Sequence, residues 1–128
     1  MKYTITRYTA NDGVFTCTYY PVTTMQGVKA IGNASAAFGL LTEAREEASF
    51  VSGIGTCATK PAQTVIGTYN KPSEHALLIV GNGTENSIRS NVFEVISGNS
   101  NDETGIVING IKLSAKKLAA LLNLLEDN

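Results

Sequence analysis

His75 is the only histidine among the 128 residues, and it is the first side chain to weigh as a catalytic or metal-binding group. A general base or a metal site requires partner groups held close by, such as further carboxylates or a cysteine. The local sequence Ser73-Glu74-His75 supplies a single carboxylate. We therefore expect His75 to be an ordinary loop or subunit-interface residue, and we expect the chain to contain no catalytic residue.

Two acidic clusters are the next candidates for a cation site or an acid–base pair. Glu43, Glu46 and Glu47 have no histidine or second acidic cluster beside them in a recognisable motif. The run Asn101-Asp102-Glu103 lacks the D-x-[DN]-x-[DN]-G spacing of a calcium loop. We interpret both clusters as solvated surface, and we expect no metal and no cofactor.

Glycines and tyrosines suggest two further kinds of binding site. Gly81-Asn82-Gly83-Thr84 has no lysine and no strand–loop–helix context, so a tight turn explains it better than a phosphate loop. Tyrosines cluster near the N-terminus, and aromatic rings on a rigid β scaffold suit stacking against sugars. Tyr19 and Tyr20 are the candidate glycan contacts, whereas cross-strand packing in a hairpin is the alternative. The full cluster is Tyr3, Tyr8, Tyr19 and Tyr20.

The bulk composition argues against several classes of function. Charged residues make up 16% of the chain and the formal net charge is −1, so no basic surface is available for a nucleic-acid backbone. No apolar run approaches membrane-spanning length, and MKYTITRYT at the N-terminus has no apolar signal segment. Abundant Thr, Asn and Gly favour strands and tight turns within one small domain.

Cys17 and Cys57 are far apart in the sequence and fit no metal or redox spacing. A disulfide between them is one interpretation. The other interpretation, which we favour, is that both are buried free thiols.

The middle of the chain contains an internal repeat of fourteen residues. The three blocks are QGVKAIGNASAAFG (26–39), LLTEAREEASFVSG (40–53) and IGTCATKPAQTVIG (54–67). Each block ends in glycine and has alanine at its fifth and ninth positions. These aligned residues are Gly39, Gly53 and Gly67, then Ala30, Ala44 and Ala58, and finally Ala34, Ala48 and Ala62.

This period predicts a β-solenoid. Fourteen residues are too few for a helix pair, but they suit one coil with two short strands and two turns. We expect small residues where neighbouring coils stack closely, and glycine where a turn requires positive φ. The residues before each glycine are mostly apolar on both strand faces, so one face would fill the coil and the other would need a partner surface.

A local alternative to the solenoid concerns residues 40–50 (LLTEAREEASF). Leu40, Leu41, Ala44 and Ala48 lie at near-helical spacing, which would make this stretch a short amphipathic helix. Such a helix would interrupt one coil without removing the repeat.

The segments around the repeat also have recognisable patterns. KYTITRYT (2–9) and VFTCTYY (14–20) flank an Asp-Gly turn and predict an antiparallel hairpin. After the repeat we expect a buried strand at 76–80, a turn at Gly81-Asn82-Gly83, and a strand at 91–96. A polar loop and a small hairpin around Asn109-Gly110 follow. The predicted divisions are 1–25 hairpin, 26–70 repeats, 71–113 strands and 114–128 helix, within a single mainly β domain.

The C-terminal helix is predicted to begin after Ser114, which is a suitable N-cap. Its leucines form one stripe at i, i+3, i+4 and i+7 spacing, so they would pack on the strands or on copies of the same helix. A helix of barely three turns is marginal alone. The stripe, our candidate for a trimer interface, consists of Leu118, Leu121, Leu122 and Leu125.

The sequence resembles two related groups of proteins. The blocks ending in A-x-x-x-x-G are similar to the head repeats of trimeric autotransporter adhesins, which also occur in phage tail fibres and tailspikes. The string GTYN (67–70), ALLIVGNGT (76–84) and RSNVFEV (89–95) resembles the segment that follows such repeats in phage and prophage tail fibres. INGIKLSAKKLAALLNLL (108–125) is similar to the short endings of those fibres. The resemblance covers roughly residues 26–125 and leaves the N-terminal hairpin unmatched.

The resemblance implies a homotrimeric, non-enzymatic component of a virion appendage, made in the bacterial cytoplasm and contributing to host attachment. Nothing in the chain matches the self-cleaving chaperone that some relatives carry. The alternatives are a glycan-binding tip and a fragment of a trimeric bacterial adhesin. A depolymerase would need a pair of carboxylates at glycosidase separation, and the scattered acids supply no such pair. We expect no nucleic-acid partner and no membrane insertion.

Overall fold

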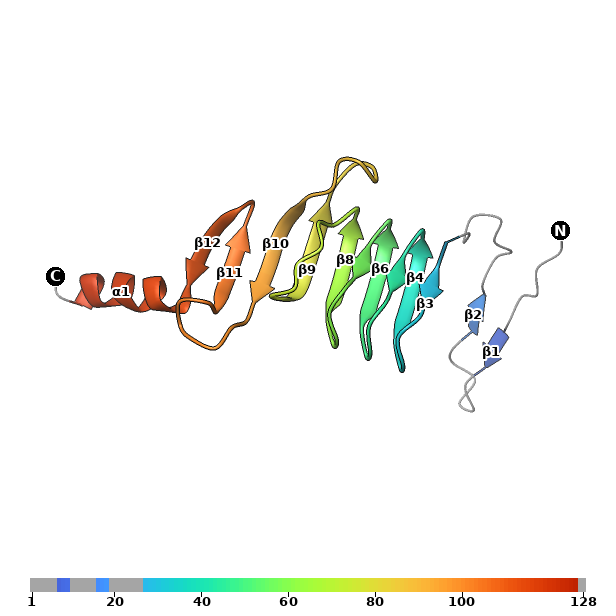
Figure 1. Ribbon diagram of the computed structural model, residues 1–128, viewed down its shortest axis with the longest axis horizontal. Coiled ribbons are helices and arrows are strands. Elements are labelled where there is room, and N and C mark those ends of the chain that lie inside the picture. The colour runs from blue at the N-terminus through green and yellow to red at the C-terminus, as the bar shows by residue number, and fades with distance from the viewer. Residues whose placement is uncertain (1–6, 10–15, 19–26, 127–128) are drawn as a thin grey trace.

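The computed structural model describes residues 7–9, 16–18 and 27–126, the first two segments as backbone only. Within these residues the fold is mainly β, with one helix at its C-terminal end. The long strands lie side by side in one row and the helix extends beyond the last of them (Figure 1). This confirms the predicted fold class in its coarse form: stacked β coils, then further strands and a terminal helix.

The two strands nearest the N-terminus pair as predicted. β1 (Arg7–Thr9) and β2 (Thr16–Thr18) are antiparallel, with Tyr8 opposite Cys17. The predicted Asp-Gly turn between them lies outside the described residues.

Each fourteen-residue block forms one coil with a short and a long strand. The three short strands form one parallel sheet, and the long strands stack in parallel with Ala37, Val51 and Val65 in register. The predicted solenoid is therefore confirmed. The short strands are β3 (Lys29–Ala30), β5 (Glu43–Ala44) and β7 (Cys57–Ala58), and the long strands are β4 (Ala36–Leu40), β6 (Phe50–Ile54) and β8 (Thr64–Thr68).

The alternative helix at residues 40–50 is wrong. Leu41 and Ala48 both adopt positive φ, at 56° and 54°, and a right-handed helix cannot pass through such residues. Between them, Ala44 lies in β5 and is fully buried between neighbouring coils. Of the four residues at helical spacing, only Ala44 is buried by stacking, whereas Leu41 and Ala48 are exposed.

The glycine at the end of each block is required by close stacking as well as by φ. Gly39, Gly53 and Gly67 have φ values of 112°, 124° and 96°. A Cβ on each would lie 2.0, 1.9 and 2.3 Å from the carbonyl oxygen of the corresponding glycine in the next coil. These glycines lie inside the long strands, so the prediction that they occupy turns is wrong: the positive φ bends the strand instead.

The two alanine columns serve different purposes. At the fifth position, Ala44 and Ala58 point into the coil and are fully buried. At the ninth position the alanines occupy the left-handed turn between the short and long strands, where their side chains are exposed. The backbone N–H of Ala48 donates to Asn33 of the preceding coil at 2.8 Å, and that of Ala62 donates to Glu47 at 2.8 Å. The turn alanines therefore link successive coils.

The long-strand sheet continues beyond the predicted end of the repeats. β9 (Ala76–Asn82) pairs in parallel with β8, and Gly81 lies opposite Gly67. The predicted turn at Gly81-Asn82-Gly83 is wrong for its first two residues, because both belong to β9. This strand is a fourth rung at the same fourteen-residue spacing, without a short strand to match.

The remaining elements extend the same sheet as an antiparallel meander. β10 (Asn91–Ile96), β11 (Gly105–Ile108) and β12 (Ile111–Ser114) complete the seven strands, and α1 (Ala115–Glu126) follows. The Asn109-Gly110 pair forms the predicted hairpin turn with φ values of 47° and 82°. The Ser114 hydroxyl accepts a hydrogen bond from the Lys117 N–H at 3.2 Å, which confirms the N-cap.

The buried apolar core lies between the two sheets of the solenoid. It is small, and all of it precedes β10. Its members are Ala44, Val51, Ala58, Val65, Ala76 and Ile79.

Candidate interaction surface

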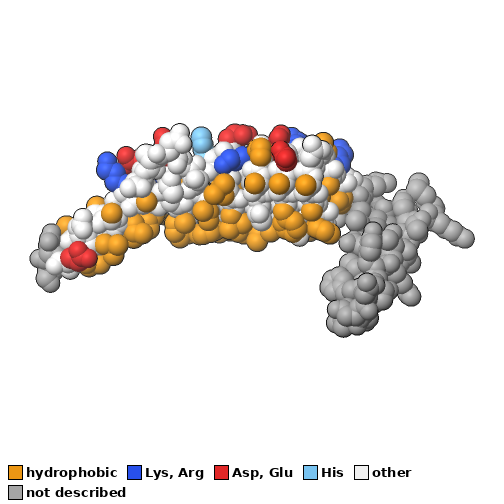
Figure 2. Space-filling model, turned by 90° about the horizontal axis from the view of Figure 1, so that it is seen from below, with side chains coloured by type: hydrophobic (Ala, Val, Ile, Leu, Met, Phe, Trp, Pro, Cys, Tyr) orange, Lys and Arg blue, Asp and Glu red, His pale blue; other side chains and the backbone are white. Residues whose placement is uncertain are grey.

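The outer face of the seven-stranded sheet carries a continuous apolar surface. Val51, Val65 and Ile79 point into the coil, so the strand positions on either side of each point outward. The register then aligns outward residues across the meander: Val80, Phe93, Ile108 and Ile111 form one row, and Leu78, Val95, Ile106 and Leu113 form another. Figure 2 shows hydrophobic side chains along the whole of one face. We call this surface the apolar face.

β-Bulges keep the apolar residues on that face where parallel pairing changes to antiparallel pairing. The register of β9 with β10 shifts at two places, which leaves Leu77 and Val92 without directly opposed partners. Because of the shift, Ala76 and Ile79 both point inward although they are three residues apart. Phe93 can then lie beside Val80 on the outer side.

Among the described residues, more large apolar side chains are exposed than buried. Phe38 is 42% exposed, Ile66 39%, Ile108 53% and Ile111 76%. Single exposed apolar residues are ordinary, but a contiguous patch on this scale marks an interaction site. The outward positions of the seven-stranded sheet, from β4 to β12, include no charged residue. Covering this face would therefore desolvate no charge.

The leucine stripe of α1 lies at the C-terminal end of the same molecule and is also uncovered. No residue of α1 is buried. The predicted interface leucines Leu118, Leu121, Leu122 and Leu125 are 46, 50, 51 and 73% exposed. The helix therefore does not pack its stripe onto its own strands, which was one of the two expectations.

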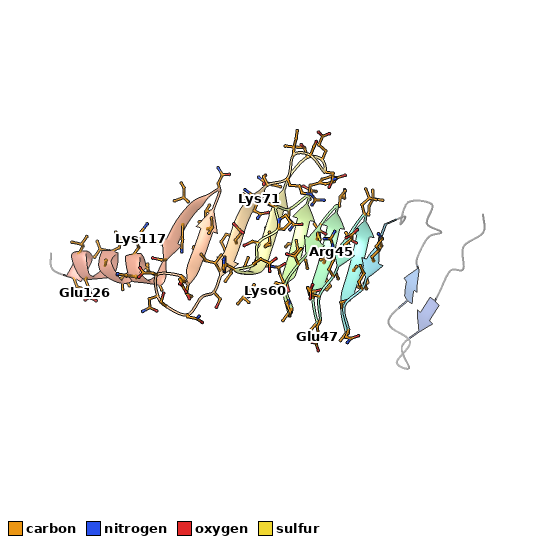
Figure 3. All side chains as sticks on the ribbon, viewed as in Figure 1. Arg45, Glu47, Lys60, Lys71, Lys117 and Glu126 are labelled. Carbon is orange, nitrogen blue, oxygen red and sulfur yellow. The ribbon has the colours of Figure 1, made fainter. Side chains whose placement is uncertain are left out.

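Charged side chains gather on the opposite side of the molecule. Figure 2 shows them along the face away from the apolar surface, and Figure 3 shows Arg45 and Lys60 among the coils. Glu43 pairs with Arg45 at 2.7 Å and with Lys29 at 3.6 Å. The hydrogen bond from Arg45 lowers the pKa of Glu43, and the same bond raises the pKa of Arg45.

The predicted solvated clusters also belong to this polar surface. Glu46 and Glu47 are exposed at the turn after β5. Asp102 lies in the loop before β11, where Lys116 approaches it at 3.5 Å with both side chains exposed. In the residues that the structure describes, no group of three His, Cys, Asp or Glu side chains could hold a metal ion.

A hollow of about 410 Å³ lies beside the second and third coils and contains Cys57 and Arg89. Arg89 donates to the carbonyl oxygens of Gly55 at 2.9 Å and Asn70 at 3.1 Å, and its guanidinium lies 5.8 Å from the centre of the Tyr69 ring. Arg89 therefore fixes the loop after β9 onto the coils.

Cys57 is a buried free thiol, which was the favoured interpretation of this cysteine, and burial raises its pKa. The side chain of Cys17 lies outside the described residues.

A larger hollow of about 710 Å³ lies where the short-strand sheet stops and the long sheet continues alone. It brings exposed His75 and its sequence neighbour Glu74 together with Glu94 and Glu103, which sequence spacing did not associate with them. Glu94 comes from β10, and Glu103 accepts a hydrogen bond from the Asn99 N–H at 2.9 Å. Only the folding of the meander over β9 creates this grouping.

The predicted glycan contacts, Tyr19 and Tyr20, lie outside the described residues.

Side-chain amides end the short-strand sheet, and their role was not predicted. Asn70 is fully buried; its Oδ1 accepts from the Cys57 N–H at 2.7 Å and its Nδ2 donates to the Cys57 carbonyl at 3.0 Å. Gln63 Oε1 accepts from the Thr59 N–H at 3.0 Å. Both amides replace a missing fourth short strand. The available signal was the break in the repeat, where Asn70 stands at the position of Thr42 and Thr56.

Comparisons with protein-family models, curated proteins and solved structures found no match. Among the described residues, no helix combines the length and apolarity needed to cross a membrane.

Proposed function

We propose that this chain is a non-enzymatic structural component of a virion appendage of the phage tail-fibre type, in which three copies associate through the apolar face. The apolar face carries this proposal. A lone chain would leave it in water from β4 to β12, together with the leucine stripe of α1, at a cost of about 25 cal/mol for each Å² of apolar surface. Symmetric self-association removes that cost, because homo-oligomers form closed, symmetric assemblies.

The resemblance to tail fibres and autotransporter heads supports three copies rather than two. In a threefold arrangement, the apolar faces meet along one axis and the charged faces turn outward. Leucines at i, i+3, i+4 and i+7 on α1 suit a parallel helical bundle on the same axis. Placement in a virion, synthesis in the bacterial cytoplasm and a part in host attachment come from the resemblance alone.

The mass of the chain in solution tests the assembly. Light scattering after gel filtration should give three times the chain mass of 13.5 kDa. Ile66→Lys introduces a charge on the apolar face and should yield monomers, whereas Glu47→Lys on the exposed turn should leave the trimer unchanged. A monomeric parent at micromolar concentration would overturn the proposal.

A second candidate function is a tip that recognises cell-surface glycans. The two hollows on the polar side favour it, because a trimer formed through the apolar face would leave both open to solvent. We expect selective binding to some members of a host-glycan panel, and loss of binding but not of trimer in Tyr19→Ala or Tyr20→Ala. Absence of binding across the panel and to whole host cells would remove this candidate. Polysaccharide incubated with the trimer should stay intact.

A further inference from the structure

The two ends of the solenoid are built differently. At the end nearer the C-terminus, Asn70 and Gln63 hydrogen-bond the outer edge of the last short strand. Gln63 Nε2 also donates to the carbonyl oxygens of Ala76 at 2.6 Å and Ser73 at 2.8 Å, so the amide satisfies groups on both sides. That end of the short sheet is closed by the chain's own side chains.

The end nearer the N-terminus is open. β3 and β4 are the last strands of their sheets, and no strand in the described part of the chain pairs with their outer edges. Ala30 is exposed although its equivalents Ala44 and Ala58 are fully buried, so the interior of the coil reaches solvent here. Among the described residues, nothing covers this end of the apolar column that fills the solenoid.

At this edge, a backbone N–H group is placed like one that links two coils inside the solenoid. In the second coil, the N–H group of Ala48 donates to the carbonyl oxygen of Asn33 in the first coil at 2.8 Å. Ala34 is its equivalent in the first coil and has a similar positive φ, 56° against 54°. No described residue accepts a hydrogen bond from the Ala34 N–H.

The β4 part of the open edge lacks two of the features that keep edge strands apart, whereas β3 carries the exposed Lys29. Proteins protect such edges with charges, prolines, bulges or covering loops. The sequence of β4, Ala-Ala-Phe-Gly-Leu, contains no charge and no proline. An edge of this kind is expected to be occupied in the working assembly.

The sequence directly before the first coil does not continue the repeat. In the block 12–25, Met25 stands where the stacking glycine is required. Pro21 stands where Ser35 and Ser49 each donate a backbone hydrogen bond within the turn, at 3.1 and 3.2 Å, and proline has no N–H. The block 12–25 therefore lacks two of the residues that an internal coil of this solenoid uses.

We propose that the outer edge of β3 and β4 receives a coil of the same fourteen-residue geometry from a second polypeptide, which joins end to end with this chain. The contacts between the first, second and third coils are the template for this joint. The partner coil must end in glycine opposite Gly39, because a Cβ there would repeat the clash seen between successive glycines. One of its carbonyl groups would accept from the Ala34 N–H. The joint deepens the proposed structural role and does not depend on the number of copies.

Hydrogen exchange with a defined coil peptide tests the joint. The probe is a 28-residue peptide that contains two tandem copies of residues 26–39, added at millimolar concentration to the full chain. Amide exchange in residues 34–41 should slow by about tenfold or more, while exchange in β11 stays unchanged. A control peptide with both terminal glycines replaced by valine should give no protection. The absence of protection by the glycine peptide, or equal protection by both peptides, would overturn the proposal.

A variant of the edge completes the test. Ala30→Glu places a carboxylate at the open end, where the lone chain exposes it and a stacked coil would bury it. It should keep the parent's melting temperature and abolish peptide protection, whereas Ala62→Glu on an exposed turn should retain protection. The same coil inserted between Met25 and Gln26 should protect residues 34–41 in cis; failure there would also overturn the joint. If Ala30→Glu abolished self-association of the chain, a second copy would occupy the edge, and this would contradict the proposal. If the trimer proposal were wrong and the joint correct, the mass of the chain without peptide would be that of a monomer, while the peptide would still protect residues 34–41.

Discussion

The coil region from β3 to β9 and the terminal region from β10 to α1 are made of similar residues but hold together in different ways. The coils enclose an interior in which Val51, Val65 and Ile79 are fully buried. In the terminal region the structure buries only Ser114, at 4% exposure. The same sheet is therefore covered on its inner side by coils in one half and stands as a single layer in the other. A single layer leaves its apolar side without cover from its own chain, which is why we propose that the terminal region takes part in assembly.

The largest effect should come from the coil contacts. Gly53→Ala would place a Cβ 1.9 Å from the Gly67 carbonyl oxygen at a φ of 124°, so two backbones would have to separate. We expect a loss of more than about 4 kcal/mol in unfolding free energy, because the change is a severe steric clash. Urea denaturation followed by circular dichroism measures it.

Gly110→Ala is the matched control in the terminal region. Gly110 also has positive φ, at 82°, but a Cβ there would meet nothing within 4 Å. Only the conformational cost of about 1–2 kcal/mol should appear. If both variants lost the same stability, close stacking would not distinguish the two regions.

The next effect concerns the amide that closes the short sheet. Asn70→Ala would leave the N–H and carbonyl of Cys57 buried without partners, at a cost of about 2–5 kcal/mol for the two groups together. Asn91 makes the same pair of bonds to Lys71, at 2.7 and 2.8 Å, but on the exposed surface where water can replace them. Asn91→Ala should therefore cost less than about 1.5 kcal/mol. Equal losses, measured by denaturation at fixed protein concentration, would contradict the distinction between buried and exposed caps.

Dilution should separate the two regions directly. If the terminal region depends on association, amide exchange in β11, β12 and α1 should speed up several-fold for each tenfold dilution, by mass action. Exchange in β6 and β8 should change little, because their partners lie in the same chain. Hydrogen exchange with mass spectrometry across a range of concentrations measures both. Concentration-independent exchange in β11 and β12 would mean that the single layer is stable without a partner.

The smallest effect should come from the ion pairs on the coil surface. Because Arg45 lowers the pKa of Glu43 in the folded state, the stabilisation is present above the unfolded pKa and is lost as the pH falls through the folded value. The exposed pair should contribute no more than about 1 kcal/mol. Melting temperatures between about pH 6 and about pH 3 should fall slightly less in Glu43→Gln than in the parent, with Glu47→Gln as the control. A larger drop in the variant would reverse the assigned sign.

Much of the coil region was predictable because its constraints repeat along the chain. Aligned glycines and alanines at fourteen-residue spacing marked the backbone positions where stacking and left-handed turns occur, and Asn109-Gly110 and Ser114 marked a hairpin and a helix start. The hairpin and helix signals depend on a few neighbouring residues, and the repeat signal depends on one local constraint that recurs every fourteen residues. The sequence by itself therefore determined the period, the glycine columns and the local caps.

Only the tertiary structure decided how far the apolar face extends and where the solenoid closes. The bulges at Leu77 and Val92 place the meander's apolar residues beside those of the coils, and nothing in local spacing predicts that alignment. Asn70 and Gln63 are ordinary polar residues until the missing fourth short strand leaves backbone groups for them to bind. His75 and Glu94 share a hollow because β10 folds back on β9. These features depend on contacts between distant residues, which become visible only when the sheet is assembled.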